Sequence, residues 1–285
     1  MGSLSPDSVT TLRVILDNIA ISTKYLPYQE PNPHRNPVYM FISILRVAIT
    51  SMAATLCLVI STPLLAETLK DQGQYKLYLS GIPAGVLAFN AVNDGNTYRI
   101  GGKLASTGLV GSVVKVSYDA QSAGLVRGDK LIPTRYSEQA NTGRRKQSSS
   151  LNYKNGVPQV LEVKPKRKPK KYDADPSKQK GTLDTLTSMY TLLRKVDQKD
   201  VCTLNVQTFD GRRRSETRLS KPIVNGNEIT CNGVYRRIEG FSPREMRERV
   251  NFEFKVVYSK LPTGQFHVTK IFTDTLFGRA SLIRQ

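Results

Sequence analysis

Short segments of alternating apolar and polar residues, separated by turn dipeptides, constrain this fold more than any other sequence feature. Asn or Asp followed by Gly tolerates the positive φ that a tight hairpin turn requires. Such dipeptides lie between or beside alternating segments at Asp94-Gly95, Asn155-Gly156, Asp210-Gly211, Asn225-Gly226 and Asn232-Gly233. Phe252, Phe254, Val256 and Tyr258 alternate with polar or smaller residues. We therefore expect an antiparallel sheet of roughly 12–14 strands with one wet face.

One amphipathic helix interrupts this pattern. Leu183, Leu186, Tyr190, Leu193 and Val196 follow one another at helical spacing and form one apolar stripe. Asp184 is the expected N-cap. A second, short helical turn is expected over residues 243–249. The predicted fold is mainly β, a curved antiparallel sheet or half-barrel with one packed amphipathic helix.

The basic loop Lys164–Lys180 divides the chain into an N-terminal β half and a helix-plus-β half. Its segment KPKRKPKK combines repelling charges with prolines that cannot donate to a strand ladder. Each half is small, so we expect one continuous sheet and a single β-rich domain over residues 67–285.

The N-terminal region is typical of an export signal. Residues 40–66 contain the basic residue Arg46, an apolar stretch and a small residue, Ala66, which is the expected cleavage position. The stretch is short for a membrane span, which needs about 20 residues; an uncleaved anchor is the alternative. Residues 1–39 are expected to be a mis-annotated extension, with translation beginning at Met40 or Met52. Export predicts a periplasmic protein of a Gram-negative bacterium, touching the membrane only through this segment if it is uncleaved.

Cys202 and Cys231 are the two cysteines that remain after such a cleavage. In an oxidising compartment this pair predicts a disulfide. Two buried free thiols are the alternative.

The chain carries a net charge of +19, and much of it lies in short clusters. We interpret these clusters as a surface for an anionic partner such as a lipid, lipopolysaccharide or peptidoglycan, because Arg pairs well with phosphate and carboxylate. A solvated cationic surface is the alternative. The candidate residues are Arg212, Arg213, Arg214, Arg236, Arg237, Arg144 and Arg145, with Lys164–Lys171 as a weaker candidate. Nucleic acid is the usual partner of so basic a chain, but export argues against it.

Catalytic and metal chemistry find little support in the sequence. His267 lies in a strand pattern without a nearby nucleophile, and Asp210 stands in a predicted turn. Asp173, Asp175 and Asp184 lack the spacing of a calcium loop. The glycines between residues 81 and 111 are expected at bends rather than in a phosphate-binding loop. We therefore expect no cofactor, no metal and no enzyme activity.

Five segments together resemble a known family: GIPAGVLAFN (81–90), STGLVGSVVKVSYDAQSAG (106–124), TLDTLTSMYTLLR (182–194), FDGRRR (209–214) and CNGVYRRIEGFSPREM (231–246). They are similar to bacterial exported proteins of the domain of unknown function 3108 family, in particular its alphaproteobacterial members. The family usually has Pro after the capping Asp, where this chain has Thr185. The resemblance implies a periplasmic protein without established activity, shaped like a lipoprotein-carrier half-barrel or a β-spiral.

Two functions follow as hypotheses. The first is a noncatalytic envelope protein that binds a lipid or other anionic amphiphile between the apolar sheet face and the helix, with arginines at the headgroup. The second is a structural or scaffolding protein that binds peptidoglycan or a protein partner through its basic face.

Overall fold

The computed structural model describes residues 68–113, 115–275 and 278–285. The expected extension (1–39), the signal segment (40–66) and the cleavage position after Ala66 lie outside the described residues. Among the described residues, no helix is both long and apolar enough to span a bilayer.

Thirteen antiparallel strands form one sheet within the described part of the chain. In sequence order, the elements are β1 (Leu69–Leu79), β2 (Ile82–Asn93), β3 (Thr97–Ser106), α2 (Gly108–Val113), β4 (Ser117–Arg127), β5 (Lys130–Asn141), β6 (Lys146–Lys154), β7 (Val157–Lys164), the 3₁₀ turn Pro176–Lys178, α3 (Thr185–Leu193), the 3₁₀ turn Gln198–Asp200, β8 (Asn205–Phe209), β9 (Arg214–Asn225), β10 (Glu228–Glu239), α4 (Pro243–Glu248), β11 (Asn251–Lys260), β12 (Phe266–Thr275) and β13 (Gly278–Arg284).

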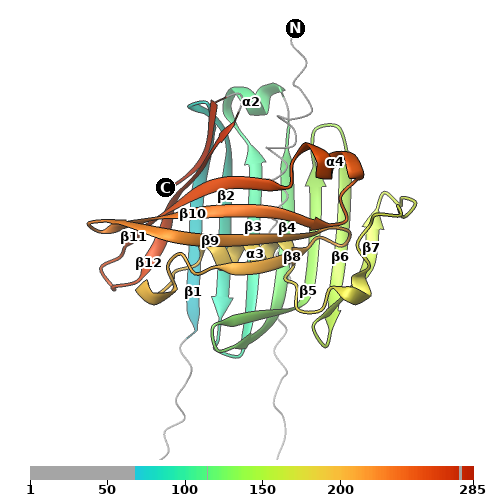
Figure 1. Ribbon diagram of the computed structural model, residues 1–285, viewed down its shortest axis with the longest axis horizontal. Coiled ribbons are helices and arrows are strands. Elements are labelled where there is room, and N and C mark those ends of the chain that lie inside the picture. Colours follow the sequence, from blue (N-terminus) through green and yellow to red (C-terminus); the bar gives the residue numbers. More distant parts are fainter. Residues whose placement is uncertain (1–67, 114, 276–277) are drawn as a thin grey trace, which may run out of the picture. The chain divides into compact units, whose positions relative to one another are not determined.

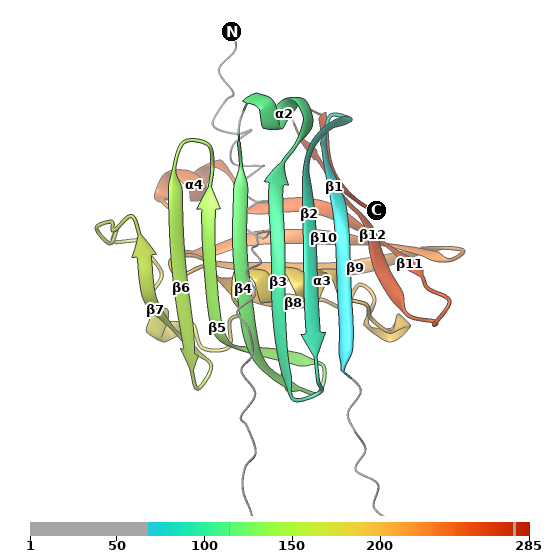
Figure 2. The same cartoon turned by 180° about the vertical axis from the view of Figure 1, so that it is seen from behind.

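The spatial order is β7-β6-β5-β4-β3-β2-β1-β13-β12-β11-β10-β9-β8. Strands that pair are consecutive in sequence, except for β1 and β13, whose pairing brings the two ends of the described chain together; β7 and β8 are consecutive in sequence but form the two edges of the sheet. Figure 1 shows β9–β11 crossing over β2–β6 at a steep angle, with α3 between the two layers. Figure 2 shows the other layer, β1–β7, from behind. The predicted curved antiparallel sheet with one packed helix is confirmed, and the sheet is nearly closed into a barrel.

Both edges of the sheet meet the segment that leads into α3. Leu183 forms a parallel bridge with Thr208 of β8 and exchanges backbone hydrogen bonds there. Near the β7 edge, the Gly181 amide donates to the Gly156 carbonyl at 2.9 Å. The segment before α3 therefore continues the sheet beyond β8 by one bridge and also contacts the β6–β7 turn.

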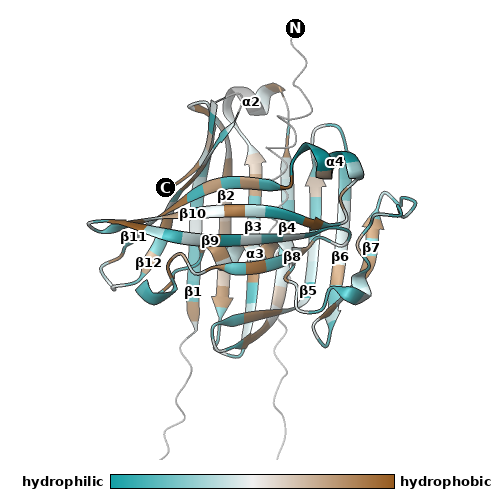
Figure 3. Cartoon of the chain, viewed as in Figure 1, coloured by the Kyte–Doolittle hydropathy of each residue, from teal (hydrophilic) through white to brown (hydrophobic). Residues whose placement is uncertain are grey.

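The core lies between the two layers and follows the strand alternation. In β1, Tyr75 and Leu77 are buried, whereas Gln74 and Lys76 are exposed. Figure 3 shows the resulting alternation of hydrophobic and hydrophilic residues along the strands. Inward apolar residues from both layers pack against Leu186 and Leu193 of α3, and this burial is the main source of stability.

A buried polar network anchors the start of α3 to the sheet. Asp184 caps the helix by accepting from the Thr187 amide at 2.8 Å, as the sequence predicts. Its other oxygen accepts from Ser122 of β4 at 2.8 Å and from the Thr187 hydroxyl at 2.7 Å. The Tyr98 hydroxyl of β3 bonds Thr187 at 3.0 Å. Burial raises the pKa of Asp184 to about 6.

Most predicted turns and helices occur where expected, with three corrections. Asn232-Gly233 does not form a turn but lies within β10, where the missing Cβ leaves room for the Phe254 ring. The predicted helix ends at Leu193, because Arg194 is already extended and Val196 pairs with Phe266. Several glycines expected at bends lie elsewhere: Gly85 lies within β2, Gly101 and Gly102 lie within β3, and Gly108 and Gly111 lie in the short helix α2. The turn expected over residues 243–249 is present as α4.

The predicted disulfide between Cys202 and Cys231 is present, with the two Cα atoms 5.3 Å apart. Cys231 is fully buried in β10, and Cys202 follows the second 3₁₀ turn. The bond therefore ties the connection after α3 to the sheet.

Candidate functional site

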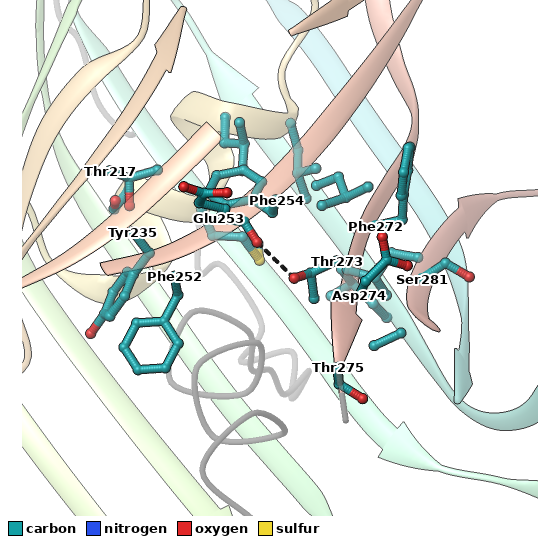
Figure 4. Close-up of a pocket in the computed structure, with 18 of the residues that line it drawn as sticks. Thr217, Tyr235, Phe252, Glu253, Phe254, Phe272, Thr273, Asp274, Thr275 and Ser281 are labelled. Carbon is teal, nitrogen blue, oxygen red and sulfur yellow. Dashed lines mark hydrogen bonds between the residues drawn. The ribbon is translucent and has the colours of Figure 1, made fainter. Parts of the chain in front are cut away.

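An apolar cavity lies where two neighbouring strands diverge. The ladder between β11 and β12 runs from Lys260↔Phe266 to Lys255↔Phe272. Beyond that pair, the Thr273 hydroxyl donates to the Glu253 carbonyl at 2.6 Å, so a side chain bridges the two strands there. The cavity is lined by the diverging ends, Phe252–Phe254 and Ile271–Thr275 (Figure 4).

The inner wall of the cavity is formed by α3 and β13. Met189, Leu192 and Leu193 line it from the helix, and Ala280 and Leu282 line it from the strand. The cavity volume is about 110 Å³. One water needs only about 10–15 Å³ on such a scale, and it also needs polar partners. The space is therefore large enough for more than one water, but its lining suits an apolar guest better.

Charged side chains stand around this apolar lining. The Arg249 guanidinium lies over the Phe252 ring at 4.9 Å, and its Nε donates to the Asn251 carbonyl at 2.9 Å. Phe272 has Arg279 over its ring at 4.8 Å. Arg279 is paired with Asp274 at 2.8 Å, which lowers the pKa of that carboxyl. Glu253 also lines the cavity, so the rim carries both signs of charge.

Two of the predicted ligand-binding arginines are buried and support the structure instead. Arg213 is 8% exposed, and its Nη2 donates to Glu245 of α4 at 2.6 Å. Arg237 is 5% exposed and donates to the carbonyls of Glu245 and Arg249 at 2.5 and 2.8 Å. Arg237 also stacks on Phe241 at 5.2 Å and on Phe252 at 4.8 Å. These contacts fix α4 and the Phe252 wall of the cavity.

The remaining predicted arginines do not join them in one site. Arg214 donates from Nε to Gln207 at 2.9 Å, and Arg212 is half-buried at the β8–β9 turn. Arg236 is exposed, pointing away from its buried neighbour Arg237. Arg144 and Arg145 are exposed in the β5–β6 turn. The cation that lines the cavity is Arg249, which belongs to a basic cluster of the sequence, with Arg244 and Arg247, but is not among the preferred candidates.

The acidic candidates serve separate local structures. Asp210 accepts from the amides of Arg212 and Arg213 at 2.9 and 2.7 Å, as a turn residue does. Asp173 accepts from Arg167 and Asp175 caps a 3₁₀ turn. Within the described ranges, no group of three or more His, Cys, Asp or Glu side chains could hold a metal ion.

Sequence reasoning missed one further carboxylate, Glu138 in β5. Its oxygens accept from Tyr118, from Tyr136 at 2.7 Å and from Ser149 at 2.8 Å. Burial raises the pKa of Glu138, although these three hydroxyls oppose the rise. Glu138 and Tyr136 share the inward parity of β5, which is the one sequence signal that could have indicated this cluster.

His267 is half-buried on β12, between the buried Phe266 and Val268. Burial, with Arg284 and Lys195 nearby, lowers its pKa.

These features define a barrel-like β protein built from one sheet around a single helix, with an apolar cavity beside that helix. The model of the family described as "Protein of unknown function (DUF3108)" matches residues 74–250. The chain therefore belongs to this family, as its sequence segments suggest.

Two other comparisons, with curated proteins and with solved structures, add little. A search of the curated proteins found no match. Among solved structures, the chain is similar to a "Beta-barrel-like Protein of Domain of Unknown Function DUF1849 from Brucella abortus". The identity is 9%, the match covers 75% of this chain and 94% of that chain, and the TM-score is 0.41.

Proposed function

We propose that this protein is a noncatalytic envelope protein that binds a lipid or another anionic amphiphile, with the apolar chain of the ligand in the cavity beside α3. The observation that carries this proposal is the cavity at the β11–β12 divergence, which combines an apolar interior with a guanidinium at its rim.

The interior supports an acyl chain as the occupant. Phe254, Ile271 and Leu192 are only partly buried although they pack against the core. Covering apolar surface of this kind is worth about 25 cal/mol per Å². A flexible chain can enter between the diverging strands, where the Thr273–Glu253 hydrogen bond takes the place of a regular ladder.

The rim supports an anionic headgroup. Arg249 is exposed, lines the cavity and forms no ion pair among the described residues, whereas Asp274 is already paired with Arg279. An Arg guanidinium binds carboxylate or phosphate through two parallel hydrogen bonds. A single-chain carboxylate or phosphate amphiphile matches this combination.

Export to the periplasm is part of the proposal. The pattern of residues 40–66 supports it, and so does the disulfide, since such bonds persist in oxidising compartments.

A displacement assay tests the binding proposal. A fluorescent fatty-acid probe would be competed with dodecanoate, dodecyl phosphate and uncharged dodecanol. We expect both anions to bind. Arg249→Gln should lower the affinity for both anions by roughly tenfold, which is the contribution of a charge-assisted hydrogen bond, and should have little effect on the affinity for dodecanol. Arg247→Gln removes an exposed charge from the same segment, outside the cavity lining, and should change neither.

Ala280→Phe tests whether the ligand binds in this cavity, because Ala280 is buried in the cavity wall. The larger side chain should reduce the affinity for all three ligands, with Ala280→Leu as a milder step if the phenylalanine variant unfolds. Absence of binding to every ligand by the folded protein would overturn the proposal and favour the scaffolding alternative.

A further inference from the structure

Two basic clusters that are distant in sequence lie at the same end of the sheet. Arg144 and Arg145 lie in the β5–β6 turn and Lys146 begins β6, while Lys164 ends β7 and residues 165–171 follow it. The register pairs Asn141 with Lys146 and Ser148 with Lys164, so the β5–β6 turn and the end of β7 are adjacent. We call residues 144–146 and 164–171 the basic corner.

The basic corner has far more positive than negative charge. Residues 144–146 and 162–173 contain nine basic side chains, whereas the acidic ones are Glu162 and Asp173. Glu162 pairs with Lys164 at 2.6 Å, and Asp173 pairs with Arg167 at 2.8 Å. Every residue from 143 to 146 and from 164 to 171 is exposed. So concentrated a charge attracts polyanions and surfaces that carry many anionic groups.

Exposed apolar side chains adjoin the basic corner on β7, the terminal strand of the sheet. Leu161 is 59% exposed and Val163 is 37% exposed. The ladder is irregular at Leu161, because Leu151 pairs with Val160 and Ser150 pairs with Glu162. This surface therefore places apolar groups beside cations, as membrane-surface segments do.

We propose that the basic corner docks this protein on an anionic membrane surface, with Leu161 and Val163 at the boundary of the headgroups. A plane of anionic headgroups requires no fixed shape from its ligand, which suits residues 165–171, a proline-containing run outside any strand or helix. Single-stranded nucleic acid favours several stacking aromatics, whereas the run ends in one, Tyr172, with Lys170 over its ring at 5.5 Å. This inference is independent of the cavity and does not rest on the proposed function.

Vesicle co-sedimentation tests the inference. The full chain would be compared on phosphatidylcholine vesicles and on vesicles that also contain phosphatidylglycerol, at rising salt. Whatever residues 40–66 contribute is common to all variants. Lys166, Lys168 and Lys171 would be changed together to Gln, and Leu161→Ser would be made separately. The matched control changes three exposed lysines outside the corner, Lys130, Lys154 and Lys199, to Gln.

We expect salt-sensitive binding that depends on phosphatidylglycerol. Each cation near such a surface contributes roughly a factor of five, so the corner variant should lose on the order of a hundredfold in partitioning. The control should lose much less, and Leu161→Ser should weaken binding without changing the salt slope. Equal losses in the two lysine variants would overturn the inference. The inference would also be overturned if the corner variant lost as much binding on neutral vesicles as on anionic ones. Tighter binding of the wild type to a single-stranded oligonucleotide than to anionic vesicles would overturn it too.

Discussion

At the scale of single residues, the strand parity of β10 separates two arginines that are neighbours in sequence. Ile229, Cys231, Tyr235 and Arg237 share the buried face, whereas Arg236 is exposed. The sequence indicated that Arg236 and Arg237 together would bind an anionic ligand. Composition alone could not show that the interior of the protein would hold one of these guanidinium groups. Arg237 can be buried because two backbone carbonyls accept hydrogen bonds from its guanidinium and two aromatic rings stack against it.

This parity predicts very unequal effects on stability for two neighbouring substitutions. Arg237→Gln should lower the free energy of unfolding by about 2–4 kcal/mol, because it removes the stacking and leaves buried carbonyls without donors. Arg236→Gln should change it by less than about 0.5 kcal/mol, as is usual for exposed positions. Urea denaturation of the two variants measures the difference. Similar losses in both would refute the structural role of Arg237.

At the scale of elements, the helix was predictable because its signals are local. The apolar spacing and the Asp184 cap lie within one segment. The hydroxyls of Ser122 and Tyr98 that complete the network come from β4 and β3, and no local pattern could place them beside Asp184. The same limit explains the Asn232-Gly233 error, since the Gly233–Phe254 contact depends on how β10 pairs with β11.

The Asp184 carboxyl should make the stability of the fold depend on pH. Its pKa is about 6 in the folded protein and about 4 in an unfolded chain. The folded state therefore binds the proton more tightly, so the contribution of Asp184 is fully present below about pH 4 and is lost as the pH rises through 6. The total loss is on the order of 3 kcal/mol.

Asp184→Asn should remove this contribution, because Asn still caps a helix but does not titrate. The difference in unfolding free energy between the variant and the wild type, measured by denaturation from pH 4 to pH 8, should shift in favour of the variant as the pH rises. A difference that stays constant over this range would contradict the assignment.

At the scale of the whole molecule, the sheet was predictable because the turn dipeptides of its hairpins can be recognised in the sequence. Closure of the sheet was not, because it depends on pairing between strands that are far apart in sequence. β1 meets β13 through Tyr75↔Arg284 to Leu79↔Ala280, and the Arg284 guanidinium donates to the Tyr75 hydroxyl at 2.8 Å. Leu183 pairs with Thr208 of β8 across a shorter separation in sequence, but this contact too lies outside any hairpin. The cavity follows from the divergence of β11 and β12, which alternation within either strand does not reveal.

Native mass spectrometry of the protein purified from a periplasmic extract tests the central claim most directly. The account predicts the mass of residues 67–285 less two hydrogens for the disulfide, together with an adduct whose mass fits an anionic, acyl-chain-bearing lipid. Arg249→Gln should reduce the adduct and Arg247→Gln should preserve it. The mature mass without any adduct, under conditions that keep a known lipid-binding protein loaded, would contradict the amphiphile-binding function.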